Sequence, residues 1–132
     1  MEEFKFASTR VIIEGDVVFS VTESATSLET AKSVLAVCAQ VLAKHKRLFM
    51  LTDVSNGFNV SAEVRRYQAE WGSKHQITGS ALFGAGAVTR GMVTLIHRAM
   101  ALVGKTTFPL GFFATEAEAR AWINDVRQKL NQ

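Results

Sequence analysis

Four polar residues follow one of the most apolar segments of the chain, residues 48–51. They are Asp53, Ser55, Asn59 and Ser61, and a predicted helix begins at Ser61. In a parallel sheet such residues lie beyond the carboxyl end of a strand, where free N–H groups and the helix dipole favour anions. The spacing therefore predicts a loop that could bind a ligand or carry a phosphate, with Ser61 as the modified residue.

Two of these residues also suit structural roles, which we favour. Asp53 at a strand end is typical of an Asx turn, in which the carboxylate accepts backbone N–H groups. Ser61 at a helix start is typical of an N-cap. The group remains the best polar candidate for a switch or ligand site.

No other set of side chains has a spacing typical of catalysis or metal binding. His45, His75 and His97 fall on different predicted elements and lack the spacing of metal ligands. The glycines of residues 84–87 are followed by neither the Lys-Ser/Thr pair of a phosphate-binding loop nor an acidic ribose partner. Cys38 lies within an apolar helical face, which favours a buried, unreactive thiol. We expect no catalytic residues, no metal and no cofactor.

Composition restricts the class of protein further. The 132 residues fit one domain, 1–132, and 48% of them are hydrophobic, enough for a core. A net charge of +3 with dispersed Lys and Arg gives no reason to expect nucleic-acid binding. We see no leader peptide, and no apolar run reaches the roughly 20 residues that span a bilayer. With one cysteine, these features predict a cytoplasmic protein without a membrane span.

Alternating strand and helix patterns predict an α/β fold. The expected strands are 4–7, 10–14, 16–22, 48–51, 81–83 and 108–113, and the expected helices are 26–43, 61–75, 88–103 and one from 115 onward. Pro109 indicates an edge position or a strand start. After the opening hairpin each strand is followed by a helix, which implies a largely parallel sheet with right-handed crossovers. The prediction is a mixed sheet of five or six strands flanked by four helices.

Short motifs mark the predicted helix ends. Thr26 with Glu29, and Thr115 with Glu118, match the capping-box pattern of a hydroxyl followed three residues later by Glu. These matches predict N-caps at Thr26 and Thr115. Gly104 stands just after the third predicted helix, where a residue in the left-handed conformation is favoured.

The third predicted helix, 88–103, carries an unusually wide apolar face. Its apolar residues cover about half of the helical wheel, more than the roughly 100° stripe of a helix with one buried side. One explanation is deeper burial inside the monomer. The other is a contact with a second subunit or an apolar ligand through Val93, Ile96 and Met100. His97 is expected on the solvated arc opposite.

Aromatic residues around the second predicted helix suggest a separate ligand site. Tyr67 and Trp71 recur at helical spacing, and Phe58 and His75 flank them. Together these four could line a cleft for an apolar molecule.

The order of elements and three motifs resemble the SpoIIAA-like branch of the STAS/Sec14-type superfamily. The motifs are Asp53-Val54-Ser55 after an apolar strand, Thr89-Arg90-Gly91-Met92 in a helix, and FFATEAEARAWI at residues 112–123. The likeness covers nearly the whole chain. It implies the α/β fold described above, together with either protein association or Sec14-like binding of an apolar ligand.

Phosphorylation of a serine switches the anti-sigma-factor antagonists of the STAS family. Here Ala62 occupies the position of that serine, and Ser61 stands one residue earlier, where that family has aspartate. This departure argues against a phosphoswitch. The sequence therefore predicts a non-catalytic regulatory or protein-interaction module that forms a homodimer, with an unidentified protein as a further partner. The alternative is a carrier of a small apolar ligand or lipid.

Overall fold

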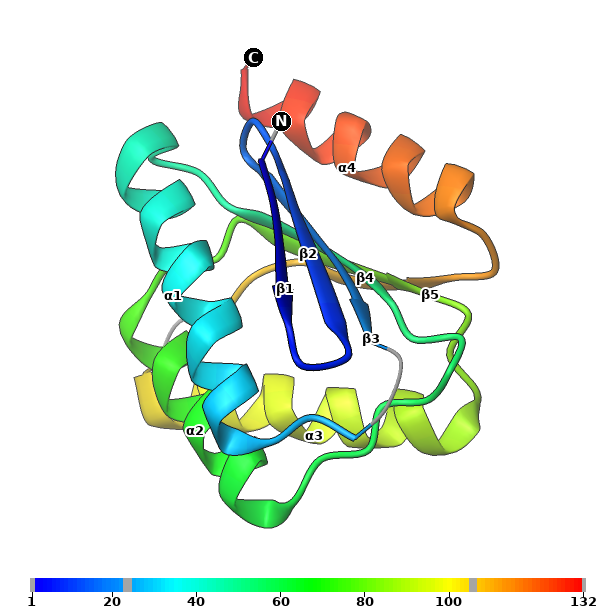
Figure 1. Cartoon of the computed structure of the whole chain (residues 1–132). Helices are drawn as coiled ribbons and strands as arrows, with labels where there is room; N and C mark the ends of the chain where they lie inside the picture. The colour runs from blue at the N-terminus through cyan, green and yellow to red at the C-terminus, as the bar shows by residue number, and fades with distance from the viewer. Residues whose placement is uncertain (1, 23–24, 105–106, 132) are drawn as a thin grey trace.

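The computed structural model describes residues 2–22, 25–104 and 107–131, which form six strands and four helices (Figure 1). Along the chain these are β1 (Glu2–Phe6), β2 (Thr9–Glu14), β3 (Val17–Thr22), α1 (Leu28–His45), β4 (Phe49–Asp53), α2 (Ala62–Lys74), β5 (Gly79–Phe83), α3 (Ala87–Gly104), β6 (Leu110–Phe113) and α4 (Glu116–Leu130). The predicted α/β class is confirmed, with six strands in one sheet.

The strands lie in the sheet in the order in which they occur in the chain, from β1 to β6. The pairs β1–β2 and β2–β3 are antiparallel, whereas β3, β4, β5 and β6 are parallel to one another. Right-handed crossovers between successive neighbours place every connecting helix on the same face. Helices α1, α2 and α3 therefore share one face, and α4, which follows the edge strand β6, covers the other (Figure 1).

Helix α1 begins one residue later than the capping pattern predicts. Ser27, not Thr26, is the N-cap, and its Oγ accepts a hydrogen bond from the Thr30 N–H at 3.1 Å. Thr26 instead forms a parallel bridge with Val60, and its N–H donates to the carbonyl oxygen of Asn59 at 3.1 Å. Pairing with a distant segment thus decides the conformation of Thr26.

The predictions for Thr115 and Pro109 are confirmed, and the one for Gly104 is wrong. Thr115 caps α4 as predicted, because its Oγ1 accepts a hydrogen bond from the Glu118 N–H at 3.2 Å. Pro109 directly precedes the edge strand β6, also as predicted. Gly104 is not a left-handed residue beyond α3 but its last helical residue. A Cβ at Gly104 would lie 2.5 Å from the Ser73 carbonyl oxygen, so glycine allows α3 to approach α2 closely.

Alternate residues of each strand face the two helical layers, because side chains alternate across a sheet. The cluster on the α4 side consists of Val17, Phe19, Phe49, Leu51, Ala81, Phe83, Ala119 and Ile123. The main cluster on the opposite side consists of Val11, Val18, Leu35, Val37, Cys38, Val41, Leu48, Trp71, Ile77 and Phe108. The sheet therefore separates two apolar layers.

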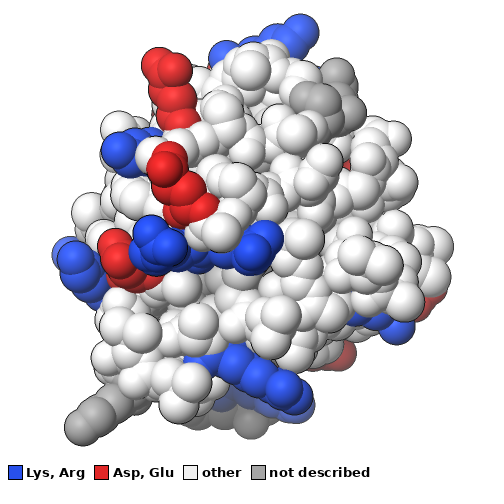
Figure 2. Space-filling view, turned by 90° about the horizontal axis from the view of Figure 1, so that it is seen from below, with Lys and Arg blue, Asp and Glu red and all other residues white. Residues whose placement is uncertain are grey.

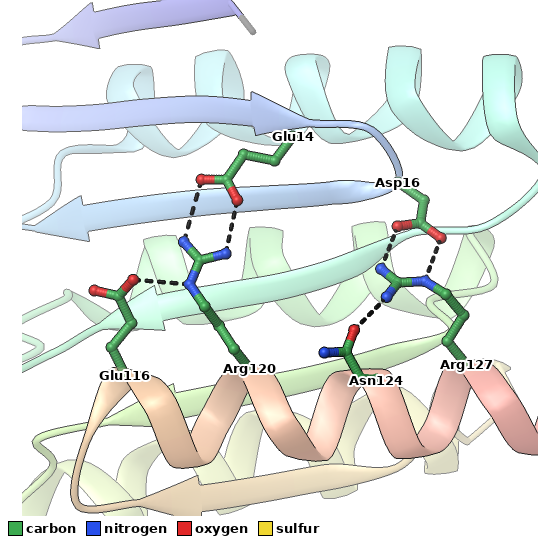
Figure 3. A network of polar contacts seen from close by, with 6 residues as sticks. All are labelled: Glu14, Asp16, Glu116, Arg120, Asn124 and Arg127. Atoms are coloured by element: carbon green, nitrogen blue, oxygen red, sulfur yellow. Dashed lines mark hydrogen bonds and ion pairs between the residues drawn. The ribbon is translucent and has the colours of Figure 1, made fainter.

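Two arginines fix α4 to the β2–β3 hairpin (Figure 3). Arg120 donates to both carboxylate oxygens of Glu14, at 2.7 and 3.2 Å, and to Glu116 at 2.8 Å. Arg127 donates to both oxygens of Asp16, at 2.6 and 3.2 Å. The hydrogen bond with Glu14 is the main cause that raises the pKa of Arg120 above its usual value. Both ends of α4 are thereby held by charge-assisted hydrogen bonds.

Candidate functional site

The predicted polar loop is held largely by contacts within the fold. Asp53 ends β4, and its Oδ1 accepts hydrogen bonds from the Ser55 N–H at 3.0 Å and the Ser55 Oγ at 2.6 Å. This is the Asx turn that the sequence favours for Asp53. Gly84, with a φ of +80°, packs the connection between β5 and α3 against this turn, since a Cβ there would lie 2.8 Å from the Ser55 Cβ.

Ser61 is the N-cap of α2, as the sequence favours. Its Oγ accepts a hydrogen bond from the Val64 N–H at 3.2 Å. Arg65 turns back from the first turns of α2 and donates to the Val60 carbonyl oxygen at 3.1 Å. Asn59 and Ser61 remain exposed, and a role of this loop as a switch or ligand site stays a prediction.

A cavity of about 130 Å³ lies between the sheet and helices α1, α2 and α3. Helix α3 packs against α2 rather than against the sheet, so its inner side forms one wall of the cavity. Residues of β2 to β6 form the floor. Among the described residues that line the cavity, none is Lys, Arg, Asp or Glu.

Hydroxyl groups from four strands form a polar part of this floor. They belong to Thr9, Ser20, Thr22, Thr52 and Ser80. Ser20 pairs directly with Thr52, and Thr9 pairs with Thr22. Thr9, Ser20 and Thr22 are 4%, 8% and 5% exposed, and the structure gives none of the five hydroxyls a hydrogen-bond partner among the described residues. Sequence reasoning missed this row, although Ser20 and Thr22 stand two residues apart in an otherwise apolar strand.

Gln68 of α2 adds a carboxamide to the lining. Its Oε1 is buried and has no hydrogen-bond partner among the described residues. An amide oxygen accepts hydrogen bonds, and leaving a buried one without a donor costs about 1–3 kcal/mol. Sequence reasoning did not single out Gln68, because a lone glutamine on an amphipathic helix is ordinarily solvated.

The four residues of the predicted aromatic cleft fall into two pairs. Phe58 and Trp71 line the cavity, whereas Tyr67 and His75 do not. The Nζ atom of Lys32 lies 5.5 Å from the centre of the Tyr67 ring. His75 stacks on Trp71 with ring centres 4.1 Å apart, and its Nδ1 lies 2.8 Å from the Trp71 carbonyl oxygen. His75 therefore supports the cavity wall from behind Trp71.

The predicted contact residues of α3 face the interior. Ile96 is buried, Val93 and Met100 are half-buried, and all three line the cavity. His97 also lines it, so the expectation of a solvated His97 is wrong. Its Nε2 lies 2.9 Å from the Phe108 carbonyl oxygen, and its ring meets the Phe108 ring edge-on with centres 4.7 Å apart. The contacts with Phe108, eleven residues later in the chain, hold His97 toward the cavity instead of toward solvent.

The opposite side of α3 carries exposed apolar side chains. Val88, Leu95 and Leu102 recur every seven residues and are 82%, 64% and 83% exposed, and Val103 is 66% exposed. We call Val88, Leu95 and Leu102 the α3 stripe, whereas Val103, seven residues after Ile96, lies nearer the side of Ile96. Figure 2 views the molecule from the side on which α2 and α3 lie, and a broad area without charged side chains adjoins a group of charged ones. Because only two described residues of α3 are buried, deep burial does not explain its wide apolar face.

Cys38 is buried within α1, as predicted, and burial raises the pKa of its thiol to about 12. In the described part of the chain, no group of three or more His, Cys, Asp and Glu side chains is placed to hold a metal ion. No helix in that part is long and apolar enough to cross a membrane.

Comparison with protein families identifies the chain. A family model described as SpoIIAA-like matches residues 17–124 of the 132. The chain belongs to the SpoIIAA-like family. The resemblance carried by the sequence motifs is therefore confirmed, and the SpoIIAA-like match includes the polar loop, all of α3 and every lining residue of the cavity except Thr9. No curated protein and no solved structure matches the chain.

Proposed function

We propose that this SpoIIAA-like protein is a non-catalytic regulatory or interaction module and that its α3 stripe binds a second copy of the chain. The observation that carries the proposal is the exposure of three large apolar side chains on one seam of α3. Exposed apolar surface that is grouped in this way is typical of protein contact sites.

The spacing within the α3 stripe suits the pairing of helices. Val88, Leu95 and Leu102 repeat every seven residues, which keeps them on one seam of the helix. Gly91 is exposed on the same helix, and the space around its missing Cβ is open, so a partner backbone can approach closely. A twofold axis places the same stripe on both sides of the contact, so that one surface serves both copies.

The oligomeric state tests this proposal. Light scattering during size-exclusion chromatography, at micromolar concentration, is expected to give twice the 14.5 kDa of one chain for the wild type. Leu95→Asp is expected to give a monomer, because a charge then lies at the centre of the contact. Leu130→Asp is the matched control, since Leu130 is 54% exposed but lies on α4. A monomeric wild type, or a monomeric Leu130→Asp variant, would contradict the proposal.

A second function, the binding of a small apolar ligand, is favoured by the cavity beneath α3. The cavity is lined mainly by apolar side chains, with a few polar groups that could orient a ligand. Native mass spectrometry of the untagged protein is the direct measurement. An added mass that disappears on denaturation supports this function, and a bare chain in every preparation counts against it.

A further inference from the structure

We infer that the cavity takes a neutral molecule about the size of one aromatic ring that carries a hydrogen-bond donor, as in phenols. Gln68 and the hydroxyls of the sheet floor select this ligand. The inference rests on the ligand-binding function proposed above and adds the chemical class of the ligand.

The lining of the cavity favours a neutral ligand. Since the described residues that line it include no Lys, Arg, Asp or Glu, a carboxylate, phosphate or ammonium group inside it would have no partner of opposite charge among them. Burial of an unpaired charge is strongly unfavourable. His97 also lines the cavity, and its Nε2 donates a hydrogen bond to the Phe108 carbonyl oxygen at 2.9 Å, so this nitrogen is not free to pair with an anion.

The polar groups of the cavity favour a ligand with a hydrogen-bond donor. The buried Oε1 of Gln68 accepts hydrogen bonds and has no donor among the described residues. Ser20 and Thr52 stand opposite each other on adjacent strands, and each hydroxyl can both donate and accept. A hydrocarbon would leave these groups unpaired, and sites of this kind reject analogues that lack the polar group.

The size of the cavity and its apolar wall favour a single ring. Trp71, Ile96 and Met100 form part of the wall opposite the sheet. The volume of about 130 Å³ is close to that of an engineered cavity of about 150 Å³ that takes benzene. A long acyl chain exceeds this volume, so the cavity suits a compact ligand rather than a lipid.

Three small probes test the ligand class: phenol, toluene of nearly the same shape, and the anion benzoate. Methyl NMR of methionine reports the site, because Met50 and Met100 line the cavity and Met92 does not. Phenol is expected to shift the Met50 and Met100 signals and to bind about tenfold more tightly than toluene, the difference that one hydrogen bond typically makes. Benzoate is expected to shift neither signal.

Replacement of the amide identifies the selecting residue. Gln68→Met keeps the approximate size of the side chain but removes the acceptor, so phenol affinity is expected to fall about tenfold while toluene affinity stays within about twofold. Gln40→Met is the matched control, because Gln40 is exposed on α1 and does not line the cavity. Amide NMR spectra of both variants check that the fold is intact.

Each contrary result has a distinct meaning. If no probe shifts the methionine signals at millimolar concentration, the ligand-binding function itself fails. If toluene binds as tightly as phenol, or if benzoate binds, ligand binding stands and the proposed class is overturned. If Gln68→Met leaves phenol affinity unchanged, Gln68 does not select the ligand.

Discussion

The two faces of one sheet are covered in different ways. On one face a single helix, α4, packs directly on the strands. On the other face three helices cover the strands, and a cavity of about 130 Å³ remains. Consecutive residues of β4 show the contrast: Phe49 and Leu51 are fully buried on the α4 face, whereas Met50 and Thr52 line the cavity. The number of covering helices therefore does not determine how tightly a sheet face is packed.

The attachment of each helix accounts for this difference. Arg120 and Arg127 of α4 lie over the rings of Phe19 and Phe49, each 5.2 Å from the ring centre, while they form ion pairs with the hairpin. Helix α3 is instead placed by α2, where the absence of a side chain at Gly72 makes room for Met100. Contact with α2 holds α3 away from the sheet, and the cavity is the space that results.

Truncation of adjacent β4 residues is expected to give the largest difference between the faces. Phe49→Ala should lower the free energy of unfolding by about 3–5 kcal/mol, because it opens a new void in a closed apolar layer. Met50→Ala should lower it by only about 2 kcal/mol, since the space that it leaves joins an existing cavity. Urea unfolding of both variants measures the two values. Equal losses would show that the two faces are packed equally tightly.

Removal of one arginine tests the polar attachment of α4. Arg127→Ala should lower the free energy of unfolding by about 2 kcal/mol, because it removes the hydrogen bonds to Asp16 and the cover over Phe49. Arg98→Ala, at an exposed position of α3, should change it by less than about 0.5 kcal/mol. Urea unfolding compares them, and similar values for the two variants would refute a special role for the α4 ion pairs.

Unfolding at alkaline pH tests whether the helical layer around α1 excludes water as completely as the α4 face does. The pKa of the Cys38 thiol is raised from 9.0 to about 12 in the folded protein, so above pH 9 the unfolded chain loses this proton first. The raised pKa of the Cys38 thiol therefore contributes to the free energy of unfolding. This contribution is fully present below pH 9 and is lost between pH 9 and about 12. Between pH 8 and pH 10 the free energy of unfolding of the wild type should fall by about 1.4 kcal/mol more than that of Cys38→Ala. Parallel unfolding profiles would mean that solvent reaches the thiol.

The fold could be predicted where local patterns decide it. Helix α4 is one-sided in sequence, and its residues Ala119, Trp122, Ile123 and Val126 pack on the α4 face as their spacing predicts. The alternation of strands and helices, with the right-handed rule for crossovers, leads to the parallel part of the sheet. The structural roles of Asp53 and Ser61 in the polar loop could also be predicted. The Asx turn and the helix cap that they form depend only on residues close to them in the chain.

The cavity could not be predicted, because it depends on contacts between distant segments. Ser20 and Thr52 become neighbours only through the register of β3 with β4. The helical wheel of α3 has apolar residues over about half of its circumference, so sequence alone does not tell which of them face the sheet. For that reason the sequence leaves burial and contact open for Ile96 and predicts a solvated His97, whereas both line the cavity.

The place of α4 in the chain order decides when one face of the sheet becomes covered during synthesis. Strands β1 to β6 and helices α1 to α3 all precede residue 116 in the chain, so they are translated before α4. Until α4 emerges from the ribosome, Phe19, Phe49 and Phe83 belong to an uncovered sheet face that can associate with other unfinished chains. A chain whose translation stops just before α4 therefore has all six strands but an uncovered apolar sheet face, which chaperones and proteases can recognise.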